Sequence, residues 1–237
     1  MLRRAVLIVV IFAFFTVPAL ADMISFVDPL AGVDDTTGWS TNDDQVGPLA
    51  HSYNLLGSTA TVAAFENVTE KFLSHRLTRG LGVWGGEDDE VDKIGGDEHI
   101  DILFSTNPYY ISEIEIRSLF DPDTDKNEEW AAIAFWKDGS LVQTEYLVGN
   151  EDLGTVGTDG DASWSGTPIL VDKLVFYVPT IEELQDAYKI GSCHNYNPSL
   201  SEFAVAELTV NPVPVPGAIL LGMIGLSVAG VKLRKFA

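Results

Sequence analysis

The sequence contains little cysteine and little positive charge. Among its 237 residues there is one cysteine, Cys193, and 14 Lys and Arg stand against 35 Asp and Glu, which gives a formal net charge of −21. A single cysteine excludes an intramolecular disulfide framework and a cysteine-based zinc site. The acid excess argues against nucleic acid as a partner, because a phosphate backbone needs a basic surface.

Signatures of several enzyme classes are also missing. The four histidines are isolated in sequence, without the H-E-x-x-H or H-x-x-E-H spacing of a zinc hydrolase. The chain has no G-x-S-x-G nucleophile motif, no P-loop and no dinucleotide fingerprint. Hydrophobic residues make up 46% of the chain, which is enough apolar material for a folded core.

The charge is placed unevenly along the chain. Residues 1–21 and 212–237 contain no acid, and together they hold five of the 14 basic residues. These five are Arg3, Arg4, Lys232, Arg234 and Lys235. Residues 22–211 therefore hold all 35 acids and the other nine basic residues, so their formal charge is 9 − 35 = −26. The sequence indicates an acidic domain between two apolar segments with basic ends.

The first 21 residues have the pattern of a secretory signal peptide. An arginine pair precedes an unbroken apolar run over residues 5–15, and Ala19 and Ala21 form a small-x-small cleavage site before Asp22. The apolar run is short for a membrane span. The alternative is an uncleaved anchor or a buried helix.

The last 26 residues have the pattern of a membrane anchor. The proline-rich segment 213–217 leads into an apolar run that continues to residue 231, and three basic residues follow among the last six. A transmembrane helix needs about 20 apolar residues, and the uncharged stretch from Val213 is close to that length. The basic end should stay on the cytoplasmic side, which leaves the acidic domain across the membrane.

This C-terminal pattern resembles a known sorting signal. The residues that carry the resemblance are Val213, Pro214, Val215, Pro216, Gly217, Leu220, Leu221, Gly222, Lys232, Arg234 and Lys235. The segment resembles the PEP-CTERM signal, in particular its Val-Pro-Leu-Pro-Ala variant, but has Val215 and Gly217 where the variant has Leu and Ala. The alternative is an ordinary single-pass anchor.

The resemblance implies a route and a partner. It implies recognition near the prolines by a membrane protease of the exosortase type, during transient residence in the inner membrane. It also implies delivery to the surface or surroundings of a Gram-negative bacterium that makes exopolysaccharide.

Residues 22–211 are predicted to form one mainly β domain, a jelly-roll-like β-sandwich with one short helix. Alternating or β-branched runs bounded by turn residues predict the strands. The expected strands are 59–66, 71–77, 100–104, 113–117, 130–136, 140–148, 169–178 and 203–210. A helix is expected to begin after Thr180, and segment 149–166 is expected to be a surface loop.

The segment 121–129 is a candidate calcium loop. Its oxygen-bearing side chains fall at alternate positions, which suits a hard cation that takes six to eight oxygens. The candidate ligands are Asp121, Asp123, Asp125, Asn127 and Glu129. The match to an EF-hand is poor, because Lys126 replaces the required glycine and Ala132 replaces the final glutamate. The alternative is a solvated acidic turn.

A second acidic run covers residues 87–98, which contain seven acids. Such a run repels itself without counterions, and ambient calcium is the expected counterion outside the cell. The candidate ligands are Asp88, Asp89, Asp92 and Asp97. The alternative is a solvated loop that maintains solubility.

Five tryptophans are relevant to sugar binding, because aromatic faces near carboxylates hold sugars on β-sandwiches. We expect Trp130 and Trp136 to pack in the core. For Trp84 and Trp164 the sequence does not decide between core packing and sugar binding. The sequence favours a non-enzymatic surface or matrix protein that contacts polysaccharide, with calcium-ordered loops or as a self-associating adhesin. The alternative is an exported polysaccharide hydrolase that uses paired carboxylates.

Overall fold

A computed structural model describes most of the acidic domain. The described residues are 21–26, 45–46, 48–55, 58–76, 80–84, 90–92, 97–105, 107–117, 129–149, 160–188, 196, 198 and 201–213. Residues Ala21–Pro212 form one compact unit. The predicted signal peptide, apart from Ala21, and the sorting segment after Val213 lie outside the described residues. Within the described part, no helix has the length and apolar character that crossing a membrane requires.

The domain is mainly β, with two antiparallel sheets. Sheet A has the strand order β12-β9-β14-β7-β6-β2, and β1 also pairs with β14. Its strands are β12 (Ala162–Val171), β9 (Tyr109–Arg117), β14 (Ala204–Pro212), β7 (Gly80–Val83), β6 (Leu73–Arg76), β2 (Gln45–Val46) and β1 (Asp22–Ser25).

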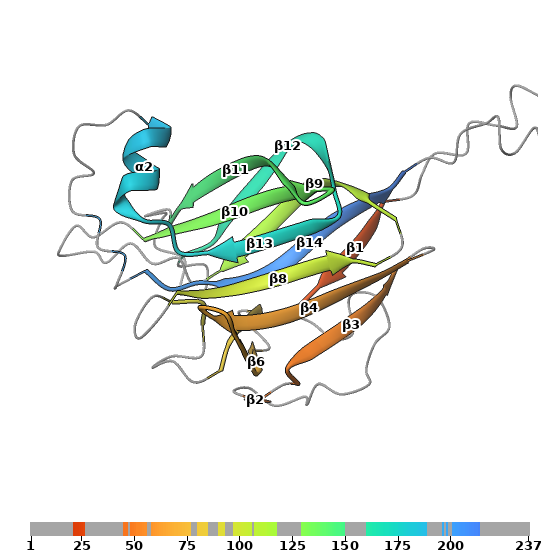
Figure 1. Ribbon diagram of the computed structural model, residues 1–237, viewed down its shortest axis with the longest axis horizontal. Helices are drawn as coiled ribbons and strands as arrows, with labels where there is room; N and C mark the ends of the chain where they lie inside the picture. Colours follow the sequence, from red (N-terminus) through yellow and green to blue (C-terminus); the bar gives the residue numbers. More distant parts are fainter. Residues whose placement is uncertain are drawn as a thin grey trace, which may run out of the picture. The chain divides into compact units, whose positions relative to one another are not determined.

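Sheet B has the order β11-β10-β13-β8-β4-β3, and β5 also pairs with β4. Its strands are β11 (Ser140–Val148), β10 (Trp130–Lys137), β13 (Lys173–Tyr177), β8 (Glu98–Phe104), β4 (Ser58–Glu66), β3 (Ala50–Leu55) and β5 (Thr69–Lys71). Figure 1 shows these strands in order, from β11 beside the helix α2 (Ile181–Tyr188) to β3.

One hydrophobic core joins the two sheets, as in a β-sandwich. Aromatic pairs bridge the layers, each with one ring from the sheet A side and one from sheet B. These pairs are Phe135–Trp164 with ring centroids 5.0 Å apart, Phe104–Tyr109 at 5.3 Å and Phe26–Tyr53 at 5.3 Å. The sequence did not decide whether Trp164 packs in the core or binds sugar; the structure shows that it is a core residue. The burial of these large rings is a main source of stability for the domain.

Period-two alternation holds in large part where the sequence predicted it. In β8 the side chains of Ile100, Ile102 and Phe104 are buried and Leu103 is exposed, whereas Asp101, which the alternation also predicted to be exposed, is buried. In β9 the alternation changes phase at Ser112, where the pairing with both neighbouring strands is shifted by a bulge. A bulge inserts one extra residue and so reverses the faces that follow it.

The hairpin between β10 and β11 has the predicted two-residue turn. Asp138 and Gly139 have φ values of 50° and 73°, and Lys137 pairs with Ser140 on either side of them. Asp172 secures the turn, because its Oδ2 accepts hydrogen bonds from the Asp138 backbone N–H at 2.6 Å and from Lys137 Nζ at 3.2 Å. The Asp-Gly sequence suits this conformation because it tolerates positive φ.

Three predicted segments were wrong in their boundaries. The run 169–178 is two strands in different sheets, β12 and β13, which meet at Asp172. The run 71–77 divides in the same way at Phe72, between β5 and β6. The run 169–178 is largely apolar on each side of Asp172, so its composition does not mark the change of sheet. The run 71–77 is largely polar on each side of Phe72, and no Gly, Pro, Asn or Asp stands at that crossing. The predicted loop 149–166 also includes the first half of β12, which pairs with β9.

Candidate functional site

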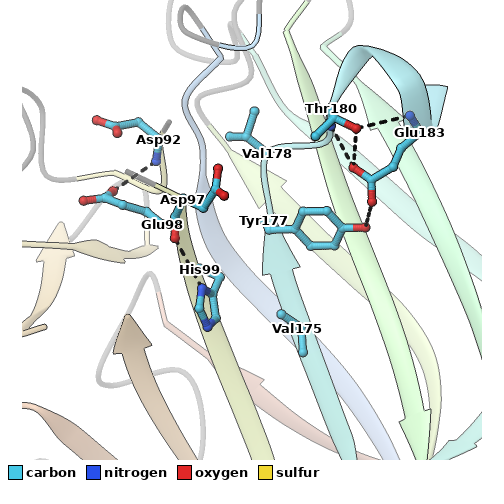
Figure 2. A pocket seen from close by; sticks show the side chains of 9 residues that line it. All are labelled: Asp92, Asp97, Glu98, His99, Val175, Tyr177, Val178, Thr180 and Glu183. Carbon is cyan, nitrogen blue, oxygen red and sulfur yellow. Dashed lines mark hydrogen bonds between the residues drawn. The ribbon is translucent and has the colours of Figure 1, made fainter. Parts of the chain in front are cut away.

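A pocket of about 320 Å³ opens at one end of sheet B. It lies between the beginning of β8 and the end of β13, where the chain enters α2 (Figure 2). Its lining residues are Asp92, Asp97, Glu98, His99, Val175, Tyr177, Val178, Thr180 and Glu183. Four of these nine side chains carry carboxyl groups and none is Lys or Arg, so the described lining of the pocket is acidic.

The beginning of α2 forms one wall of the pocket. Thr180 is the N-cap, and its Oγ1 accepts a hydrogen bond of 3.2 Å from the Glu183 backbone N–H. In return, Oε2 of Glu183 accepts hydrogen bonds from the Thr180 backbone N–H at 2.8 Å and from its hydroxyl at 2.9 Å. This reciprocal arrangement is a capping box, and it begins the helix where the sequence predicted.

Tyr177 attaches that wall to sheet B. Its hydroxyl donates a hydrogen bond of 3.0 Å to Oε1 of Glu183, as Figure 2 shows. Burial raises the pKa of this hydroxyl far above its ordinary value, and the Glu183 carboxylate adds to the shift. Tyr177 therefore remains a protonated donor, and both carboxylate oxygens of Glu183 have donors.

The opposite wall comes from the start of β8 and the segment before it. Val91 forms an isolated bridge with Phe203, and this bridge fixes the position of the next residue, Asp92. The Asp92 backbone N–H donates a hydrogen bond of 3.1 Å to Oε2 of Glu98. Both acids are nearly inaccessible, with exposed fractions of 2% for Asp92 and 4% for Glu98.

The buried position changes the chemistry of Glu98. Burial, and then the nearby charge of Asp92, raise the pKa of this carboxyl from 4.5 to about 8, despite the hydrogen bond from the Asp92 backbone. Burial has this direction because it penalises the charged form of an acid. At neutral pH Glu98 is therefore mostly protonated.

The next residues of the wall are more accessible. Asp97 is exposed, and its carbonyl oxygen accepts a hydrogen bond of 2.8 Å from the backbone N–H of Asn67. His99 is half-buried and stacks on Phe65, with ring centroids 5.1 Å apart and planes within 11°. Asp97 thus offers an exposed carboxylate beside an ordered imidazole.

The structure places only part of the predicted metal sites. Glu129 is buried, and its carbonyl oxygen accepts a hydrogen bond from the Gly149 backbone N–H at 3.0 Å. Asp92 and Asp97 line the pocket at the start of β8. The other candidates lie outside the described residues; they are Asp88, Asp89, Asp121, Asp123, Asp125 and Asn127. Over the described ranges alone, no three acidic, His or Cys side chains form a group suited to a metal ion.

Sequence reasoning did not assign Glu98, Tyr177 or Glu183 to the site. A signal for Glu98 was present, because the alternation that buries Ile100 and Ile102 also places Glu98 on the inward face. Tyr177 and Glu183 gave no such signal, because their contribution depends on β13 pairing with β8. A buried acid at the end of an inward-facing row is therefore the part of the pocket that the sequence could have indicated.

The expectation that Trp130 and Trp136 pack in the core was wrong. Both side chains are half-buried and lie outside the core cluster. Trp130 packs against Tyr188 of α2, with ring centroids 5.5 Å apart. Trp136 pairs with Lys173 of β13, on the face of sheet B that is turned away from the core. Aromatic surface is therefore available on the outer face of sheet B.

Comparison with known proteins does not assign the chain to a family. No protein-family model matches the chain, and no curated protein is similar to it. The function must therefore be argued from the domain, its pocket and the sequence of its two ends.

Proposed function

We propose that the chain is an exported protein, sorted through its C-terminus to the cell surface or extracellular matrix. Its acidic domain acts there as a non-enzymatic binding module associated with exopolysaccharide. In this proposal residues 1–21 are a signal peptide, and residues 212–237 hold the sorting motif, a transmembrane helix and a basic tail. The finer fold is a single jelly-roll-like sandwich, and an exosortase-type membrane protease is the processing partner.

The distribution of charge carries this proposal. All 35 acids lie between two apolar segments whose charged residues are basic. Basic residues beside an apolar span favour the cytoplasmic side, so the two ends agree on a single topology with the acidic domain outside. The acidic pocket, and Trp136 on the outer face of sheet B, support a binding role for that domain.

Fractionation of a Gram-negative host that contains an exosortase-type protease tests the sorting. The full chain should reach the outer surface or the medium and sediment with exopolysaccharide. A variant with Pro214→Ala and Pro216→Ala should accumulate in the inner membrane, whereas the control Ser227→Ala in the same segment should be sorted normally. Equal distribution of all three proteins would contradict the proposal.

Calcium is proposed to stabilise the acidic loops. The full chain should then unfold at a temperature several degrees higher with calcium than with chelator, because a ligand that binds only the native state stabilises it. Magnesium at the same ionic strength should have a smaller effect. Substitution of Asp121, Asp123 and Asp125 by Asn should remove the difference in unfolding temperature between calcium and chelator. An equal rise in unfolding temperature with calcium and with magnesium would contradict the proposed calcium binding.

The raised pKa of Glu98 favours a second candidate function. A carboxyl that keeps its proton at neutral pH can serve as a general acid, and Asp92 and Asp97 line the same pocket. An exported polysaccharide hydrolase with paired carboxylates would release new reducing ends from exopolysaccharide. Release by the natural chain and not by Glu98→Gln would select this function over the binding module.

A further inference from the structure

Sheet B ends at β11, which pairs with β10 and with no other strand of the described chain (Figure 1). Beyond its last residue, the Gly149 backbone N–H donates a hydrogen bond of 3.0 Å to the carbonyl oxygen of Glu129, which stands directly opposite. Hydrogen-bonded pairs alternate along an antiparallel ladder, so the odd-numbered residues 143–147 also bond to β10. The residues whose backbone groups point away from β10 are therefore Thr144, Tyr146 and Val148.

These outward backbone groups are nearly unused. The Tyr188 hydroxyl donates a hydrogen bond of 3.5 Å to the carbonyl oxygen of Tyr146, at an exposed position. Among the described residues, no other group bonds to the outward N–H and C=O groups of β11. An open row of such groups at a sheet edge is a template for pairing with a further strand.

The strand also lacks the usual features that prevent edge pairing. Residues 143–148 contain no Pro, Gly, Lys or Arg, and the bulge of β11 at Val142 leaves this part of the ladder regular. Both edges of sheet A differ. At one edge β12 has Gly166, Pro168 and a shift in pairing, and at the other β2 has two residues. β11 is therefore well suited to pairing.

We propose that β11 pairs antiparallel with β11 of a second copy of this chain, about a two-fold axis at Tyr146. Tyr146 then stands opposite Tyr146 of the second copy, and Thr144 stands opposite Val148. Each outward N–H gains a carbonyl acceptor, and the Tyr188 hydroxyl gives up its place at Tyr146. The two copies of sheet B become one continuous sheet, which is a symmetric form of strand addition.

The strand is complementary to itself in this arrangement. A copy reversed about Tyr146 presents outward groups to outward groups, whereas a shift by one residue would not. Its cross-strand pairs are aromatic or β-branched, and such pairs stabilise sheets. Glu145, the one charged residue of β11, stands opposite Leu147 of the second copy. Residues 22–211 carry a formal charge of −26, so repulsion elsewhere on the domain confines the contact to this edge.

Hydrogen exchange of the full chain in detergent, at low and high protein concentration, tests the pairing. The amides of Thr144, Tyr146 and Val148 should exchange at least tenfold more slowly in the concentrated sample, because only the paired strand protects them. The amides of Glu145 and Leu147, which already bond to β10, should not change. A chain that stays monomeric, or a dimer without this protection, would overturn the inference.

Two variants of Val148 separate the backbone ladder from side-chain contact. Val148→Pro removes one outward N–H and leaves the bonds to β10, since proline is tolerated where the N–H faces an edge. Sedimentation should show dimerisation at least tenfold weaker. Val148→Ala keeps the N–H and should weaken dimerisation less than threefold. Equal weakening by the two, with thermal unfolding unchanged, would overturn the pairing.

The register has its own test. About an axis at Tyr146, the two Glu145 side chains are diagonal neighbours, and their like charges oppose dimerisation. Glu145→Gln should therefore tighten dimerisation at least threefold at low salt. Glu113→Gln removes the same charge from an exposed position on β9 of sheet A and should tighten it less than twofold. Equal effects would mean that net charge alone acts, which overturns this register.

The interface goes beyond the proposed function and fails separately from it, because it depends on β11 alone. A protein that reaches the surface as a monomer contradicts the interface and leaves the sorting intact. A protein that dimerises through β11 but stays in the cytoplasm contradicts the sorting and leaves the interface intact.

Discussion

The backbone N–H of Asp92 donates a hydrogen bond of 3.1 Å to Oε2 of Glu98, and the two acids lie together where water is nearly excluded. Burial and the charge of Asp92 raise the pKa of Glu98 to about 8, from an ordinary value of 4.5. Between these two pH values the folded protein holds a proton that the unfolded chain has lost. The contribution of Glu98 to stability therefore falls as pH rises from 4.5 to 8, and it is constant above that range.

Substitution of Glu98 by Gln should remove this dependence on pH. The amide keeps an acceptor for the Asp92 backbone N–H but cannot ionise. Relative to the natural chain, the free energy of unfolding of the variant should change little near pH 4.5 and rise by roughly 1–3 kcal/mol by pH 8 to 9. Urea unfolding at several pH values measures the difference. The exposed control Glu113→Gln should give a curve parallel to that of the natural chain, and a parallel curve for Glu98→Gln would contradict the assignment.

The capping box of α2 should contribute measurably to stability. Thr180→Ala removes the side chain that accepts the Glu183 backbone N–H, and loss of an N-cap costs about 1 kcal/mol. Thr69→Ala, an exposed position on β5, should cost less than about 0.5 kcal/mol. Urea unfolding of both variants compares the two costs. Equal values would mean that α2 is not held by its cap.

The contact between Phe135 and Trp164 should be among the costliest to remove. Phe135 is fully buried and its ring lies 5.0 Å from that of Trp164 in the other sheet. Phe135→Ala should therefore lower the free energy of unfolding by about 3–5 kcal/mol. Phe72→Ala, at a position that is 48% exposed, removes the same side chain at a cost below about 1 kcal/mol. Similar losses in thermal stability for the two variants would contradict the packing of the two sheets.

Two glycines should respond differently to alanine, although both have positive φ. A Cβ at Gly80, where φ is +119°, would collide with the carbonyl oxygen of Val205, so Gly80→Ala should cost more than about 3 kcal/mol. At Gly139, where φ is +73°, nothing lies within 4 Å of an added Cβ. Gly139→Ala should cost only the backbone strain of about 1–2 kcal/mol. Denaturant titration distinguishes the two, and the reverse order would contradict the placement of β7 against β14.

The strands with clear alternation and the hairpin with an Asp-Gly turn could be predicted from the sequence. So could α2, because Thr180 and Glu183 form a local capping pair. The crossings at Phe72 and Asp172 could not, since each joins two segments of similar composition in different sheets, mostly polar around Phe72 and mostly apolar around Asp172. The pocket also escaped prediction, because its walls come from Asp92, from residues 97–99 and from residues 175–183, and only the long-range pairing of β8 with β13 brings them together.

The intact mass of the protein recovered from the cell surface tests the central claim most directly, because it reports both ends of the exported chain at once. The proposed sorting predicts a chain that begins at Asp22 and ends near Gly217, with the acidic domain complete between them. Recovery of the chain only from the cytoplasm, with Met1 and the basic tail both present, would contradict the account.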